Sequence, residues 1–251
     1  MRVLVTNDDG VSAPGVHALA LAAADAGCTV VVAAPDSEQS GTSAAVSAVE
    51  DDGRVVVKRY DLGETEAYGV AGSPALIALL AAHGAFGDPP DAVLSGVNRG
   101  ANAGRAVLHS GTVGAALTAA AAGIRGLAVS LDVAFPVTDD EGRHWATAAR
   151  VGVDLLPALA SAAAGVVFNV NTPDVAYADL RGVRRAGLAR FGQVQMTVVE
   201  SGEGFVRTSL EQTGEQPAAG TDLAAIADGY ASVTPIRALA ELSDVEIPGV
   251  D

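Results

Sequence analysis

Residues 2–10 read RVLVTNDDG, a run of aliphatic and β-branched side chains that ends in an asparagine, two aspartates and a glycine. Such a run, apolar on both faces, is typical of a strand buried inside a parallel sheet. We expect it to be the first of five strands of this kind. The others are Thr29–Ala33, Ala92–Ser95, Leu127–Leu131 and Val166–Val170.

Segments of helical length and period separate these strands. The first helix is expected to begin near Pro14, with Ser12 as its N-cap. Further helices are expected over Pro74–Ala82, Thr112–Ala122 and Trp145–Ala163. Strands that alternate with helices pack as parallel strands joined by right-handed crossovers. The sequence therefore predicts an α/β fold, a Rossmann-like doubly wound sheet that is mostly parallel.

The pattern changes from about residue 182 onward. Val194–Val199 and Phe205–Leu210 flank a glycine-containing turn and predict a β-hairpin, and Tyr230–Pro235 predicts one more strand. We expect a single domain over residues 1–251, with residues 182–235 as a hairpin extension. Because an isolated two-stranded ribbon is marginally stable in water, this extension is expected to pair with a second subunit.

The composition limits the classes of partner. Fifteen Lys and Arg residues against thirty Asp and Glu residues give a net charge of −15, which argues against binding to nucleic acid polymers or anionic membranes. The single cysteine, Cys28, excludes an internal disulfide and a Cys/His zinc site. The chain shows neither a signal-peptide pattern nor about 18 consecutive apolar residues, so we expect a cytoplasmic protein.

Polar side chains gather where the expected strands end. Asp8 and Asp9 follow the first strand, Ser40 lies beyond the second, and Asn98 and Asn102 follow the strand that begins at Ala92. In doubly wound sheets, ligands bind at this carboxyl edge. Adjacent carboxylates are costly unless a cation lies nearby, and oxygen donors suit Mg²⁺ or Mn²⁺. The alternative interpretation of the two aspartates is a solvated Asp-Gly turn.

A second cluster opens the third expected helix. Ser110, Gly111 and Thr112 could offer backbone N–H groups and hydroxyls to a phosphate, although a plain N-cap is the commoner use of such residues. His109, just before them, could donate a proton to a leaving group, but a lone histidine is more often structural. His144 is interpreted as structural.

The characteristic sequence motifs of several enzyme classes are missing from this chain. The sequence contains neither a Gly-x-Gly-x-x-Gly dinucleotide fingerprint after a strand nor a Walker A motif. The Gly-x-Ser-x-Gly elbow of serine hydrolases does not occur either. A haloacid-dehalogenase-type phosphatase needs a nucleophilic aspartate where this chain has Asn7, so it stays a minor alternative. The non-enzyme alternative is a nucleotide-binding sensor domain that uses the same edge without turnover.

Taken in order, these segments resemble the SurE family, the survival-protein phosphatases also known as 5′-nucleotidases. The resemblance rests on LVTNDDG at 4–10, APD at 34–36 with QSG at 39–41, SGVNRGAN at 95–102, SGTV at 110–113, NVNTPD at 169–174, GTD at 220–222 and GYASVTP at 229–235. The motifs cover nearly the whole chain. One departure stands at residues 72–76, which read GSPAL where the family usually has Gly-Thr-Pro-x-Asp-Cys.

The resemblance implies a Rossmann-like core with one divalent metal ion per subunit, Mg²⁺ or Mn²⁺, that releases phosphate from nucleoside monophosphates. It also implies a homodimer or homotetramer built through the C-terminal hairpin. The family's metal ligands map onto Asp8, Asp9, Ser40 and Asn98. Its phosphate site maps onto Asn102, Ser110, Gly111 and Thr112, and Asn7 is expected beside them as a substrate contact.

The expected reaction is metal-assisted hydrolysis of a phosphate monoester, with Asp8 and Asp9 as the catalytic residues. Asp9 is the better candidate to orient or deprotonate the attacking water. The strand-end segments carry no aromatic residue that could stack on a base. We therefore expect loose base discrimination, with several nucleoside monophosphates and other small phosphate esters accepted.

Overall fold

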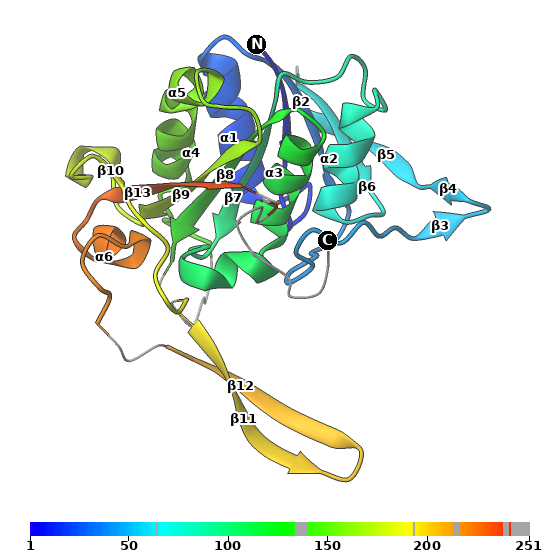
Figure 1. Cartoon of the computed structure of the whole chain (residues 1–251). Helices are drawn as coiled ribbons and strands as arrows, with labels where there is room; N and C mark the ends of the chain where they lie inside the picture. The colour runs from blue at the N-terminus through cyan, green and yellow to red at the C-terminus, as the bar shows by residue number, and fades with distance from the viewer. Residues whose placement is uncertain (64, 134–139, 193, 213–215, 238–240, 242–251) are drawn as a thin grey trace, which may run out of the picture.

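The computed structural model describes residues 1–63, 65–133, 140–192, 194–212, 216–237 and 241. Its main feature is a nine-stranded sheet in the order β10-β13-β9-β8-β7-β1-β2-β6-β5 (Figure 1). The strands are β1 (Arg2–Thr6), β2 (Thr29–Pro35), β5 (Val57–Leu62), β6 (Thr65–Val70), β7 (Ala92–Arg99), β8 (Arg125–Asp132), β9 (Val166–Pro173), β10 (Val183–Arg185) and β13 (Ala231–Arg237). The six strands from β6 to β9 are parallel, whereas β5 and β13 run antiparallel to their inner neighbours.

Helices cover both faces of this sheet (Figure 1). The first face carries α1 (Pro14–Asp25), α4 (Trp145–Asp154) and α5 (Leu156–Ala160), and the opposite face carries α2 (Pro74–Ala82) and α3 (Gly111–Ala121). The helix α6 (Asp222–Ala227) packs beside β13. Apolar side chains of both strand faces are buried against these helices, so the predicted doubly wound α/β fold is confirmed.

The order of the strands creates a switch point at β1. The crossover through α1 leads from β1 to β2 on one side, and the crossover through α2 leads from β6 to β7 on the other side. Strands β1 and β7 are paired up to Thr6 and Ser95, so both end at the same edge of the sheet. Ligands of doubly wound sheets bind in the crevice at such a point.

The five predicted strands are present, and β7 extends four residues past its predicted end. Asn98 therefore lies within β7, where the pairing with β8 shifts register between Ser95 and Asn98. Gly96 in this irregularity has φ +135°, and a Cβ there would lie 2.1 Å from the backbone oxygen of Val129. Only glycine fits this position, where the irregularity changes the direction of the strand just before Asn98.

Two helix predictions need correction. The N-cap of α1 is Ala13 and makes no side-chain capping bond, so Ser12 is not the cap, although Pro14 opens the helix as predicted. The single helix expected over Trp145–Ala163 is two helices, α4 and α5, that meet at Leu155. Pro157 lies in the first turn of α5 and has no N–H to continue the hydrogen bonds of α4.

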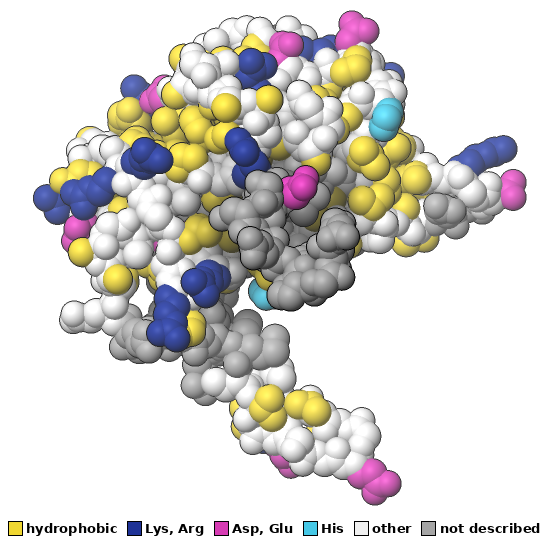
Figure 2. Space-filling view, viewed as in Figure 1, with side chains coloured by type: hydrophobic (Ala, Val, Ile, Leu, Met, Phe, Trp, Pro, Cys, Tyr) yellow, Lys and Arg dark blue, Asp and Glu magenta, His cyan; other side chains and the backbone are white. Residues whose placement is uncertain are grey.

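The predicted hairpin is present as β11 (Val194–Gly202) and β12 (Phe205–Gln212), which are antiparallel and extend away from the sheet (Figure 1). Exposed apolar side chains lie on this arm (Figure 2); they are Val198, Val199, Phe205 and Val206. The predicted strand at Tyr230–Pro235 is β13, an inner strand between β10 and β9. Residues 182–235 are therefore only partly an extension, because β10 and β13 belong to the main sheet.

The structure also has strands that the sequence analysis missed. These are β5 and β6, which form one edge of the main sheet, β10 at the opposite edge, and a small ribbon of β3 (Glu50–Asp51) and β4 (Arg54–Val55). Two short 3₁₀ helices, η1 (Gly104–His109) and η2 (Tyr177–Asp179), connect larger elements. Among the described residues, no helix is both long and apolar enough to cross a membrane.

Candidate metal and phosphate site

The strand ends at the switch point surround an open cavity of about 260 Å³. All four predicted metal ligands line it, namely Asp8, Asp9, Ser40 and Asn98. Asn102, His109 and Ser110 line it as well. The four predicted metal ligands come from three separate segments of the chain, which meet because β2 and β7 both lie beside β1 in the sheet.

Asp8 is the most enclosed carboxylate of the site, with 5% of its surface exposed. Its Oδ1 accepts a short hydrogen bond from the hydroxyl of Thr112 at the start of α3. Its backbone oxygen accepts from the Gln39 N–H at 2.8 Å, which ties the segment that carries Ser40 to β1. Burial raises the pKa of Asp8, although the bonds from Thr112 and from the backbone of Gly111 work in the opposite direction.

Asp9 is held from the other side, because its Oδ2 accepts the backbone N–H of Arg99 at 3.2 Å. Burial, with a further contribution from the neighbouring Asp8 carboxylate, raises the pKa of Asp9 from its usual 3.8 to about 7. Two adjacent carboxylates taken out of water disfavour their own ionisation. The nearby positive charge of Arg99 lowers the pKa of Asp9 but does not offset burial and the Asp8 charge.

The donor set suits a hard divalent cation. Asn98 donates from Nδ2 to the backbone oxygen of Gly100 at 2.7 Å, and its Oδ1 lies 3.1 Å from the Thr112 hydroxyl. Ser40 donates to Glu38 Oε1 at 2.6 Å. No group of three or more His, Cys, Asp or Glu side chains that could hold a metal occurs in the described part of the chain. A metal here would therefore depend on two carboxylates with neutral oxygens, the ligands that Mg²⁺ and Mn²⁺ accept.

The start of α3 is directed at Asp8. The Ser110 side chain caps the helix by accepting the Val113 N–H at 3.0 Å, so it has the plain N-cap role left open above. A Cβ on Gly111 would lie 2.8 Å from Asp8 Oδ2, which shows how closely the helix end approaches the carboxylate. In the protein without a ligand, the hydrogen-bond donors at the start of α3 therefore interact with the Asp8 carboxylate.

Asn102 is held by the neighbouring strands. Its N–H donates to Asn171 Oδ1 at 2.7 Å, and its backbone oxygen accepts from Asn169 at 2.7 Å and from Asn171 at 3.1 Å. Its side chain donates to the Ser130 hydroxyl at 3.0 Å. The loop after β7 is therefore fixed over a buried polar layer on β8 and β9, which the sequence analysis did not assign to the site.

Asn7 was expected to contact the substrate, but its side chain lies in the interior of the loop after β1. It is fully buried, and both polar atoms of its amide bond to the backbone of Gly10 at 3.1 Å. These two bonds close the turn that presents Asp8 and Asp9. Asn7 therefore shapes the loop and does not offer its side chain to a substrate.

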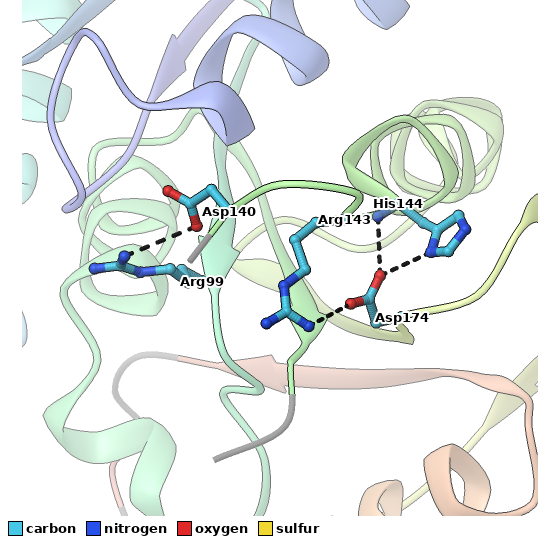
Figure 3. Close-up of polar contacts among 5 residues, drawn as sticks. All are labelled: Arg99, Asp140, Arg143, His144 and Asp174. Atoms are coloured by element: carbon cyan, nitrogen blue, oxygen red, sulfur yellow. Dashed lines mark hydrogen bonds and ion pairs between the residues drawn. The ribbon is translucent and has the colours of Figure 1, made fainter. Parts of the chain in front are cut away.

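The cavity also holds charged residues that the sequence analysis did not assign to it. Glu38 and Arg99 both line it. Arg99 Nη1 lies 3.8 Å from Asp140 Oδ1, a contact visible in Figure 3. Glu38 and Arg99 could have been assigned to the site from the sequence, because they lie in strand-end segments next to Ser40 and Asn98.

A second ionic cluster lies at the end of β9 (Figure 3). Asp174 pairs with Arg143 at 3.0 Å and accepts from the backbone and ring nitrogens of His144, each at 2.9 Å. Desolvation alone would raise the pKa of Asp174, but the bonds from His144 and Arg143 outweigh it and lower the pKa. The carboxylate partner of His144 stands 30 residues away in the chain, so the sequence analysis did not foresee this contact.

Comparison with known proteins agrees with this geometry. The family model described as "Survival protein SurE" matches residues 3–197. A relative from Xanthomonas campestris pv. campestris (strain B100), named 5′-nucleotidase SurE, is 39% identical over 243 residues, which is 94% of this chain and 90% of the relative. A relative of the same name from Xanthomonas euvesicatoria pv. vesicatoria (strain 85-10) is 38% identical over the same shares.

A solved structure gives the same result for the fold. The crystal structure of the SurE protein from Aquifex aeolicus superposes with a TM-score of 0.76 at 28% sequence identity, over 97% of this chain and 95% of the other. The matched family model, these relatives and this structural neighbour lead to one conclusion: the chain belongs to the SurE family.

Proposed function

We propose that this protein is a metal-dependent phosphomonoesterase that hydrolyses nucleoside 5′-monophosphates to nucleoside and phosphate with loose base discrimination. The relatives named 5′-nucleotidase support the reaction class. The observation that carries the metal dependence is geometric: the adjacent carboxylates of Asp8 and Asp9 line one cavity with the neutral oxygen donors of Ser40 and Asn98 at the switch point.

Asp8, Asp9, Ser40 and Asn98 would hold one Mg²⁺ or Mn²⁺, which would supply Lewis acidity and offset the negative charge of the phosphoryl oxygens. Thr112 orients this set, because its hydroxyl contacts Asp8 and lies 3.1 Å from Asn98 Oδ1. Positioning and charge stabilisation account for most of the catalysis of phosphoryl transfer. The rigid placement of these side chains is therefore their main contribution.

Hydrolysis joins a water oxygen to phosphorus and breaks the bond to the 5′ oxygen of the nucleoside, which leaves as an alcohol. We assign Asp9 to orient the water and to accept its proton, because its carboxylate lines the cavity and is held in place by the Arg99 N–H at 3.2 Å. His109 lines the cavity and is our candidate to return a proton to the leaving oxygen. The Ser110–Thr112 segment and Asn102 complete the phosphate site.

Loose base discrimination follows from what the cavity offers a base. Its lining combines charged, amide, hydroxyl and small side chains, and none of its described lining residues is Phe, Trp or Tyr. Without an aromatic face, stacking contributes little to the choice of base. Recognition by the phosphate leaves room for several nucleotides and for small phosphate esters such as p-nitrophenyl phosphate.

We further propose that the protein is a homodimer or homotetramer assembled through the hairpin of β11 and β12. The support is physical. Val198, Val199, Phe205 and Val206 are each more than half exposed on a two-stranded ribbon that extends from the body (Figure 1). Burial of these side chains against a second copy would remove apolar surface from water.

Phosphate release tests the proposal. Purified protein is incubated with a panel of nucleoside monophosphates and p-nitrophenyl phosphate, with Mg²⁺, Mn²⁺ or a chelator. We expect turnover that requires metal and is lost in Asp8→Asn, whereas Asp36→Asn, an exposed aspartate beside β2, should keep it. Binding of nucleotides without phosphate release would support a sensor domain instead. A preference above about a thousandfold in kcat/KM for one nucleotide, roughly 4 kcal/mol, would contradict loose discrimination.

A further inference from the structure

Arg99 gives the cavity a cation of its own. Three carboxylates line the cavity, those of Asp8, Asp9 and Glu38, and the whole chain carries a net charge of −15. Arg99 is the only Lys or Arg among the described residues that line it. A phosphate dianion entering this cavity therefore meets one fixed positive side chain, and nothing in the reaction described above uses it.

The backbone of Arg99 is anchored independently of its side chain. The residue pairs with Leu131 of β8 and donates its N–H to Asp9 Oδ2 at 3.2 Å. Its guanidinium is consequently carried on a rigid strand end, next to the carboxylate that we assign to the attacking water. Substitution of the side chain leaves the N–H bond to Asp9 available.

The only ion pair recorded for the Arg99 guanidinium in the described chain is loose. The distance to Asp140 is 3.8 Å, and the two side chains are 36% and 38% exposed. The neighbouring pair of Arg143 and Asp174 spans 3.0 Å, with side chains 18% and 15% exposed, and His144 bonds to the same carboxylate (Figure 3). Exposed pairs with this geometry contribute little to stability, so little free energy opposes the displacement of Asp140 by another anion.

We propose that the Arg99 guanidinium binds the phosphate of the substrate, and that the Asp140 carboxylate is its displaceable counterion in the absence of substrate. The identity of the substrate rests on the function proposed above. The planar guanidinium offers two parallel N–H donors to two phosphate oxygens, and an incoming dianion carries more charge than the single carboxylate it replaces. Binding then exchanges one anion for another on a side chain whose backbone does not move.

The test measures the affinity for inorganic phosphate by isothermal titration calorimetry in the presence of Mg²⁺, together with kcat and KM for p-nitrophenyl phosphate. Arg99→Gln should weaken phosphate binding at least tenfold, and Arg99→Lys should recover part of the loss because it keeps the charge but not the planar fork. Asp140→Asn should tighten phosphate binding about two- to fivefold, since it removes the competing anion. Arg105→Gln, which removes the same charge from an exposed residue of η1 outside the cavity lining, is the matched control.

The outcomes separate this inference from the proposed function. Phosphate affinity in Arg99→Gln within twofold of the wild type, with wild-type turnover intact, overturns the role of Arg99. The same loss of affinity in Arg105→Gln also overturns it, because the effect would then be general electrostatics. Phosphate binding that depends on Arg99 in a wild-type protein without turnover supports the anion contact and overturns only the proposed reaction.

Discussion

Substitution of Asp9 by asparagine is expected to stabilise the metal-free protein while it abolishes metal binding and turnover. The Asp9 carboxylate is half-buried beside Asp8, and its pKa of about 7 reflects the cost of keeping it ionised there. Asparagine has the same shape and can accept the Arg99 N–H that now donates to Asp9 at 3.2 Å. The variant therefore removes an unfavourable charge and keeps the hydrogen bond.

The size of the stability change follows from the raised pKa of Asp9. A carboxyl whose pKa rises from 3.8 to about 7 destabilises the folded state by at most about 4 kcal/mol at pH 7.5. Residual hydration at the open cavity reduces this, so we expect a gain of about 2 kcal/mol, or about 4–8 °C in Tm, for Asp9→Asn. The folded state binds more protons than the unfolded state, so the stability of the metal-free wild type falls as the pH rises from about 4 to about 7.

Thermal unfolding followed by circular dichroism checks this expectation, with a chelator or with MnCl₂, at pH 5 and pH 7.5. With Mn²⁺ at a hundred times its Kd, the wild type should gain about 2.7 kcal/mol and Asp9→Asn should gain almost nothing. Without metal, the advantage of the variant should shrink at pH 5 to less than half its value at pH 7.5. Asp36→Asn controls for the loss of one exposed charge at a neighbouring strand end.

Two results would refute the reasoning. The first is a metal-free Asp9→Asn variant that melts at or below the wild type at pH 7.5. The second is a wild-type stability that does not decrease between pH 5 and pH 7.5 in the presence of the chelator. Either would mean that the Asp9 carboxylate is not held at an unfavourable cost in the folded protein.

Three further predictions concern other parts of the structure. Thr112→Val removes the hydroxyl that contacts Asp8 and Asn98, so kcat/KM for phosphate release should fall at least tenfold, whereas Thr118→Val in the same helix should not lower it. Asp174→Asn should lower stability by about 1–3 kcal/mol at pH 7, measured by urea unfolding, and the difference should vanish as the pH falls through the lowered pKa of Asp174. Deletion of residues 194–212 should reduce the mass measured by light scattering to that of one chain, and an unchanged assembly would contradict a role for the hairpin.

Local patterns in the sequence predicted the centre of this protein. Strands buried on both faces are mostly apolar, so the run within Arg2–Thr6 can be recognised from composition alone. The carboxyl ends of parallel strands share one edge of the sheet, which is why Asp8, Asp9, Ser40 and Asn98 could be placed together before the structure was considered. The hairpin at Val194–Leu210 was predictable for a similar local reason, because its two strands flank a glycine-containing turn.

The errors at the edge of the sheet and in the helices have local causes as well. The edge strand β5 is mixed and mostly exposed, so it shows no apolar run. The apolar stripe of Trp145–Ala163 continues across the break at Leu155, and periodicity does not register that Pro157 lacks the N–H needed to continue the helix. Ser12 has the chemistry of an N-cap, but the chain places Ala13 at that position.

Only the tertiary structure decided which polar groups face one another. Asn102 is held by Asn171 across 69 residues, and Thr112 bonds to Asp8 across 104 residues. The pKa of Asp9 depends on how far the folded chain removes it from water, which no pattern within residues 2–10 records. The sequence determined that Asp8, Asp9, Ser40 and Asn98 reach one edge, because the carboxyl ends of parallel strands share that edge of the sheet. Their bonds and protonation were decided by contacts between distant segments, because burial and hydrogen bonding exist only once those segments have packed.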